Sequence, residues 1–157
     1  MRPVHRRLQH QQRGTALIET ALVLPLLTLL LLGVVNMGLV IREHQILQNA
    51  AREGARYSTL QSNRIDAAGD AAAQAALLAK LQTRVQRYLA QEHITIALSD
   101  VTINQNYKYA VDGSSNVTGS QVTVSYSRSM LVASSGLWPF GPVTLTGEAV
   151  FRNFYGR

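Results

Sequence analysis

An uncharged apolar run at residues 20–41, TALVLPLLTLLLLGVVNMGLVI, constrains this chain more than any other feature. As an α-helix, this run of 22 residues would extend about 33 Å, which matches the roughly 30 Å hydrocarbon core of a bilayer. The run has no polar face, so it does not fit the core of a small soluble domain. The sequence therefore predicts a single transmembrane helix.

Basic residues on one side of the run predict its orientation. Four arginines and no acid lie in the first 14 residues, ahead of the run, whereas Arg42 after it is balanced at once by Glu43. Arginines and lysines beside a span remain cytoplasmic, so we expect a cytoplasmic N-terminus and a C-terminal part outside the cytoplasm. The same four arginines supply most of the net charge of +6, which argues against nucleic-acid binding by the folded part. They are Arg2, Arg6, Arg7 and Arg13.

A glycine and a glutamate mark the start of the apolar helix. Gly14 ends the basic leader, and Glu19 follows five positions later, where a secretory signal peptide would not place a charge. This arrangement resembles the class III signal of type IV prepilins, which a membrane aspartyl peptidase cuts after the glycine. The resemblance implies Gly14 as the last leader residue and Thr15 as the new N-terminus. It also implies that the Thr15 amine pairs with Glu19 of a neighbouring subunit during assembly.

A second stretch narrows the resemblance to one family. Residues 47–57, LQNAAREGARY, and the start, RGTALIETALVLPLL, resemble TadE-like proteins, the minor pilins (pseudopilins) of the tight-adherence (Tad, or Flp) type IV pilus. The resemblance implies a structural, assembly-priming component of a pilus used for adherence and biofilm formation. The implied partners are a prepilin peptidase, the major pilin, a sister minor pilin and the Tad inner-membrane assembly platform. The implied location is the bacterial inner membrane, with a periplasmic or extracellular C-terminal domain and the pilus as a further destination.

An uncleaved, membrane-anchored binding module of the cell envelope is the alternative function. In that case Gly14 would be a linker residue, and Glu19 would extend its carboxylate to the lipid headgroups. The mass of the mature chain distinguishes the two, because only a processed pilin begins at Thr15.

Small residues recur every four positions after the apolar run. Ala50, Gly54 and Ser58 form one such series, and Ala51 and Ala55 form another beside it. Together they give a helix a narrow face that lets a second helix approach closely. That second helix would belong either to this chain or to a neighbouring subunit.

The C-terminal part is expected to be an α+β domain, with a second helix against an antiparallel sheet of three or four strands, as in type IV pilins. The expected organisation is a basic leader at 1–14, a transmembrane helix at 15–41 and an extracytoplasmic domain at 42–157. Its expected elements are helices at about 42–60 and 65–92 and strands at about 94–109, 121–128 and 143–152. Asp66 is the expected N-cap of the second helix, and residues 110–120 are expected to form a loop.

No pattern of catalytic or metal-binding residues stands out. The chain has no cysteine, its four histidines are dispersed, and it has no GxSxG or P-loop pattern. We therefore expect no enzyme activity, no cofactor, no metal and no small-molecule substrate. Leu137, Trp138 and Phe140 are expected to fold inward over the sheet, although an exposed anchor for a partner is the other reading.

Overall fold

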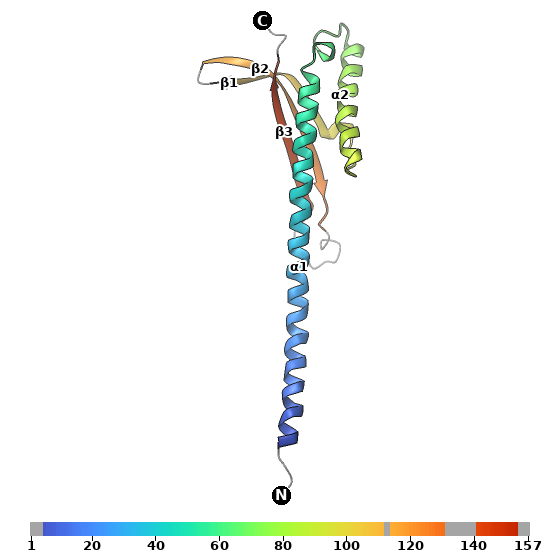
Figure 1. Ribbon diagram of the computed structural model, residues 1–157. Helices are drawn as coiled ribbons and strands as arrows, with labels where there is room; N and C mark the ends of the chain where they lie inside the picture. The colour runs from blue at the N-terminus through green and yellow to red at the C-terminus, as the bar shows by residue number, and fades with distance from the viewer. Residues whose placement is uncertain (1–4, 112–113, 131–140, 154–157) are drawn as a thin grey trace. The chain divides into compact units, whose positions relative to one another are not determined.

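The computed structural model describes residues 5–111, 114–130 and 141–153, and it describes side chains at 16–110, 117–130 and 141–153. The chain divides into two units, Met1–Leu39 and Val40–Arg157, which are described separately. The predicted fold class is confirmed: a long N-terminal apolar helix, a second helix and a three-stranded antiparallel sheet make an α+β fold (Figure 1).

The first unit contains most of helix α1, which spans His5–Ser58. Large apolar side chains from Leu17 to Met37 are exposed all around this helix. The hydroxyls of Thr20 and Thr28 each donate to the carbonyl four residues earlier, at 2.8 Å, so neither needs water as an acceptor. Within the described residues, this is the one helix that is long and apolar enough to cross a membrane, by length and composition.

The second unit begins inside α1, and its second helix starts later than the sequence predicts. Helix α2 spans Ala71–Gln91 and follows a short 3₁₀ turn at Gln61–Asn63. Gly69 has a φ of +82°, which breaks any helix begun near residue 65. The prediction of Asp66 as the N-cap was therefore wrong. Asp70 is the N-cap instead, and its carboxylate accepts from the Ala73 amide at 2.7 Å.

The first strand also starts later than predicted. Ile94 and Ile96 are buried but lie in an irregular segment, which is followed by a 3₁₀ turn at Leu98–Asp100. The Asp100 carboxylate closes that turn by accepting from the Ala97 amide at 2.9 Å. Strand β1 therefore spans Val101–Val111, and the strand predicted from residue 94 was wrong over its first seven positions.

The segment predicted as a loop at 110–120 belongs mostly to strands. Strand β2 spans Ser114–Arg128 and pairs with β1, forming a hairpin whose turn end extends away from both helices (Figure 1). Few of the residues at 114–120 favour strands, so their pairing depends on the tyrosine-rich strand opposite them. Strand β3 spans Val143–Arg152, as predicted, and pairs with β2 to complete the order β1-β2-β3.

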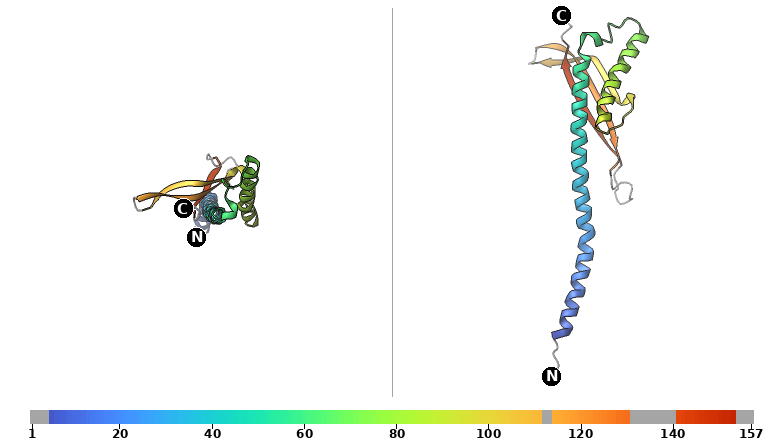
Figure 2. Two further views of the ribbon diagram at one scale, coloured as in Figure 1. Left: turned by 90° about the horizontal axis from the view of Figure 1, so that it is seen from above. Right: turned by 45° about the vertical axis from the view of Figure 1, so that its right-hand side comes forward.

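The hydrophobic core lies between the sheet and the two helices. The part of α1 in the second unit and helix α2 pack on the same face of the sheet (Figure 2), because both contribute to one buried cluster. The other face carries alternate polar residues of the three strands and is not covered by either helix. The core consists of Leu47, Ala50, Ala51, Ala55, Val85, Leu89, Ile94, Ile96, Val101, Val122, Val124 and Leu145.

Candidate functional site

The candidate processing segment lies within α1. The backbone at Gly14 and Thr15 is helical, and their side-chain environment lies outside the described residues. Glu19 is exposed and forms no ion pair with a described side chain. It lies four residues after Thr15, so one turn of helix, about 6 Å of rise, separates the carboxylate from the amine that cleavage would create. The processing at Gly14 and Thr15 and the pairing of Glu19 with a neighbouring subunit's Thr15 amine remain predictions.

The predicted stripe of small residues is buried inside the C-terminal unit. Ala50, Ala51 and Ala55 are fully buried. A Cβ at Gly54 would lie 2.6 Å from Cγ2 of Val85 in α2 and 3.3 Å from Cγ1 of Val122 in β2. The sequence alone was compatible with a partner helix in this chain or in another subunit. Here the stripe packs against the chain's own second helix and sheet.

A second glycine brings α1 close to β3. A Cβ at Gly147 would lie 2.5 Å from both the carbonyl carbon and the oxygen of Leu47, which are backbone atoms. The bare glycine therefore allows the helix to lie directly on the strand. No local pattern indicates that this glycine contacts α1, because the contact joins residues a hundred positions apart.

Ion pairs connect α1 to the rest of the C-terminal unit. Glu43 pairs with Arg128 at the end of β2, and both side chains are largely buried. One oxygen of this carboxylate and the Nε of Arg128 are buried without a further partner in the described residues. A buried ion pair of this kind adds little to the stability of the fold, and its larger effect is to determine which side chains contact each other. Its two members lie 85 positions apart, so no local pattern could have indicated the contact.

A second, more exposed pair joins α1 to α2. Glu53 accepts from Arg84 at 3.2 Å, and the Arg84 guanidinium lies 5.2 Å from the centre of the Tyr57 ring. Both charged side chains are more than one-third exposed, so the pair contributes at most about 1 kcal/mol. Its main effect is to set the position of α2 along α1.

A buried glutamine holds the end of α1. Strand alternation places the Gln105 side chain on the same face of β1 as Val101 and Ile103, towards the helices, next to a bulge between Asn104 and Tyr107. Its amide nitrogen donates to the carbonyls of Ser58 and Asn63, at 3.0 and 2.8 Å, while its oxygen accepts from the Ile65 amide at 2.8 Å. One side chain thus satisfies three backbone groups where the helix ends.

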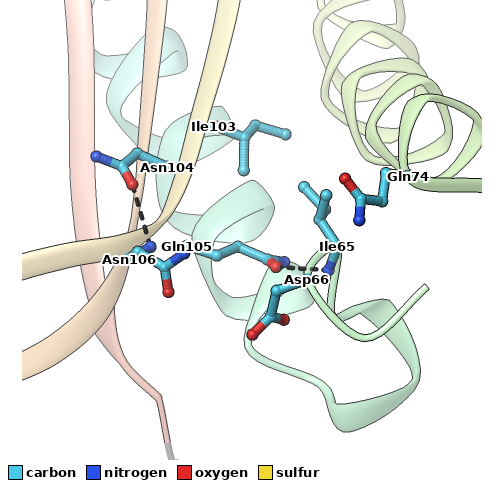
Figure 3. A pocket seen from close by; sticks show the side chains of 7 residues that line it. All are labelled: Ile65, Asp66, Gln74, Ile103, Asn104, Gln105 and Asn106. Atoms are coloured by element: carbon cyan, nitrogen blue, oxygen red, sulfur yellow. Dashed lines mark hydrogen bonds between the residues drawn. The ribbon is translucent and has the colours of Figure 1, made fainter. Parts of the chain in front are cut away.

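A hollow of about 300 Å³ lies beside this glutamine (Figure 3). The Asn104 oxygen accepts from the Asn106 amide at 3.1 Å, which stabilises the bulge at its rim. The lining mixes amides with two isoleucines and has no cluster of charged or nucleophilic groups, so it indicates no chemistry. The lining residues are Ile65, Asp66, Gln74, Ile103, Asn104, Gln105 and Asn106.

The carboxyl of Asp66 lies at this rim. The Arg64 guanidinium donates to Asp66 at 2.8 Å and thereby holds the pKa of Asp66 below its usual 3.8. Asp66 is about half exposed, so solvent weakens the interaction.

The described residues contain no group of three His, Cys, Asp or Glu side chains that could hold a metal ion. Leu137, Trp138 and Phe140 lie outside the described residues.

Comparison with known proteins gives one match. The family model described as TadE-like protein matches residues 14–56. No curated protein and no solved structure matches the chain. The matched segment begins at Gly14 and ends at Arg56, so it covers the apolar run, Glu19 and the small residues from Ala50 to Ala55. The resemblance identified from the sequence is thus confirmed: residues 14–56 form a TadE-like segment, which associates this chain with the Tad pilus system.

Proposed function

We propose that this chain is a minor pilin of a Tad pilus, cut after Gly14 by a prepilin peptidase and held in the inner membrane by α1. The observation that carries the proposal is the TadE-like match, which begins at the same glycine. Helix α1 supports it, because it is long and apolar enough to span a membrane. In this role the C-terminal unit lies outside the cytoplasm and presents a folded surface to the major pilin, a sister minor pilin and the assembly platform.

The proposed role is structural. An apolar helix carrying a single acid near its start provides an anchor that can bundle with similar helices, and it offers no reaction centre. Burying Glu19 in such a bundle is costly unless a cation accompanies it. The amine of Thr15, freed by cleavage, would supply that cation at the N-terminus of a neighbouring helix. The pair would also fix the axial register between the two subunits.

The direct test of processing is the intact mass of the chain after co-expression with a cognate prepilin peptidase. We expect fourteen residues to be removed, leaving Thr15 as the N-terminus. Gly14→Phe should block the cut, because a bulky side chain obstructs a protease that needs the backbone close. A full-length mass with active peptidase present would contradict processing and favour the uncleaved anchor.

Topology has a separate test. A reporter that is active only outside the cytoplasm, fused after Arg157, should be active, because the arginine-rich end of the chain remains inside. Activity of a cytoplasmic reporter at the same position would reverse the proposed orientation.

A further inference from the structure

The face of the sheet that neither helix covers (Figure 2) carries a pair of tyrosines. Tyr107 and Tyr109 lie two residues apart on β1, so strand alternation places both side chains on one face. Tyr107 pairs in register with Gly119. The next residue of β2, Ser120, points the other way and contacts Ser58 of α1. Gly119 and both tyrosines therefore belong to the outer face of the sheet.

The two tyrosine rings are nearly parallel. Their centroids are 6.4 Å apart and their planes differ by 20°. A Cβ at Gly119 would lie 2.9 Å from Cε1 of Tyr109 and 3.1 Å from Cγ1 of Val150. A side chain at this position of the middle strand would therefore displace the ring. The bare glycine lets Tyr109 lie against the sheet, while both rings remain partly exposed.

Hydrogen-bonding groups lie beside the rings with little net charge. Arg152 of β3 also pairs in register with Gly119, on the opposite side of the middle strand from Tyr107. Gln121 donates to Glu148 at 2.7 Å, which orients the amide and leaves its oxygen for another donor. Of the outer-face side chains that the structure describes, Glu148 and Arg152 are the charged ones, and their charges cancel. We call this site the tyrosine platform, and it consists of Tyr107, Tyr109, Gln121, Glu148 and Arg152.

We propose that the tyrosine platform binds a neutral polysaccharide. One face of a pyranose ring presents weakly positive C–H groups, which stack on the electron-rich face of an aromatic ring. The hydroxyls at the edge of the sugar both donate and accept hydrogen bonds, so they suit an amide, a carboxylate and a guanidinium on one surface. Two nearly parallel rings receive neighbouring sugar units of one chain.

The charge and composition of the platform disfavour other ligands. Single-stranded nucleic acid also stacks on aromatic side chains, but it requires cations along its phosphates, and Glu148 offsets Arg152 here. A protein interface has a core rich in large apolar side chains. To the two rings, the described part of the outer face adds only the aliphatic side chains of Val117 and Val150. A neutral chain of hydroxyl-bearing rings satisfies both constraints.

This binding role goes beyond the structural role proposed above. It requires neither cleavage after Gly14 nor pairing of Glu19, so an uncleaved anchor would have it as well. Failure of one proposal is therefore distinguishable from failure of the other.

The test is binding of neutral hexasaccharides to the full chain in lipid nanodiscs, because maltoside detergents contain the sugar chemistry under test. The probes are cellohexaose, chitohexaose and maltohexaose. Saturation of the aromatic protons of the protein should transfer to the ring protons of at least one probe in NMR spectra, with a Kd of about 1 mM. No transfer to any probe at about 10 mM, or tighter binding of single-stranded oligothymidine than of every sugar, would overturn the proposal.

Ring substitutions then test the stacking. Tyr107→Leu and Tyr109→Leu each remove a ring but keep an apolar side chain, so each should raise the Kd about three- to tenfold. The corresponding phenylalanine variants keep the ring and should change the Kd less than about twofold. Lys108→Ala is the control, because it alters the opposite face of the same strand and should leave the Kd unchanged. Equal affinity of the leucine and phenylalanine variants would contradict stacking on the rings.

A polar substitution leaves both rings in place. Gln121→Leu removes the amide beside the platform and should raise the Kd about three- to tenfold. Hydrogen–deuterium exchange in β1 and β2 shows whether each variant keeps its fold. Wild-type affinity in Gln121→Leu, or losses of affinity found only in variants whose exchange is faster throughout both strands, would count against the platform.

Discussion

Gly147→Ala should loosen the contact between α1 and the sheet. The added methyl carbon would lie 2.5 Å from the carbonyl carbon and oxygen of Leu47, whereas carbon atoms pack at about 3.5–4 Å. Because both atoms belong to the helix backbone, no rotamer change relieves the overlap, and α1 must withdraw by about 1 Å. Overpacking of this kind lowers the free energy of unfolding by up to about 3 kcal/mol. The alanine recovers about 0.5–1 kcal/mol by restricting the unfolded chain, so the net loss is about 2 kcal/mol.

Hydrogen–deuterium exchange of the full chain in detergent measures this loss, because the opening free energy of β3 sets the exchange rate of its amides. A loss of 2 kcal/mol should speed exchange in β3 about 30-fold. Gly141→Ala is the control, since a Cβ there meets nothing within 4 Å. Exchange in β3 that changes less than about threefold in Gly147→Ala, or equally in both variants, would refute the close approach of helix and strand.

Two further predictions concern the end of α1. Gln105→Leu should lower the free energy of unfolding by about 3 kcal/mol and accelerate hydrogen–deuterium exchange at residues 57–66, because it leaves the carbonyls of Ser58 and Asn63 and the Ile65 amide without partners. Unchanged exchange at these residues would contradict the role of this glutamine. The Asp66 carboxyl should titrate below 3.8, because Arg64 lowers its pKa. The lowered pKa means that the ionised Asp66 stabilises the folded state by less than about 1 kcal/mol above pH 3.8. This stabilisation is lost as the pH falls through the pKa that Asp66 has in the folded state. An NMR titration measures the midpoint, and Arg64→Gln should raise it.

The pattern of apolar and polar residues along the chain predicted the helices and strands that depend on local composition. Helix α1 follows from an uninterrupted apolar run, and β3 follows from alternating residues at 143–152. The start of α2 was misplaced because the left-handed Gly69 interrupts a segment with good helix formers on both sides. The beginning of β2 was missed because its residues have weak strand propensity and are held by β1.

The candidate processing site remains a prediction from order along the chain. Gly14, Thr15 and Glu19 are proposed from their spacing and from the arginines before them, and the family match begins at the same glycine. The contacts of Gln105 and Arg128 were not predictable, since each joins residues more than 40 positions apart through the packed sheet.

Co-assembly of a Glu19→Val variant tests the central claim most directly. The change should leave insertion and processing intact, because it removes a charge from an apolar helix. If the chain is a pilin whose Glu19 pairs with a neighbour's Thr15 amine, the processed variant should lose co-purification with its partner pilins, and the cells should lose pili. Wild-type levels of both would mean that Glu19 is only a tolerated charge at the membrane surface, and would contradict assembly through this residue.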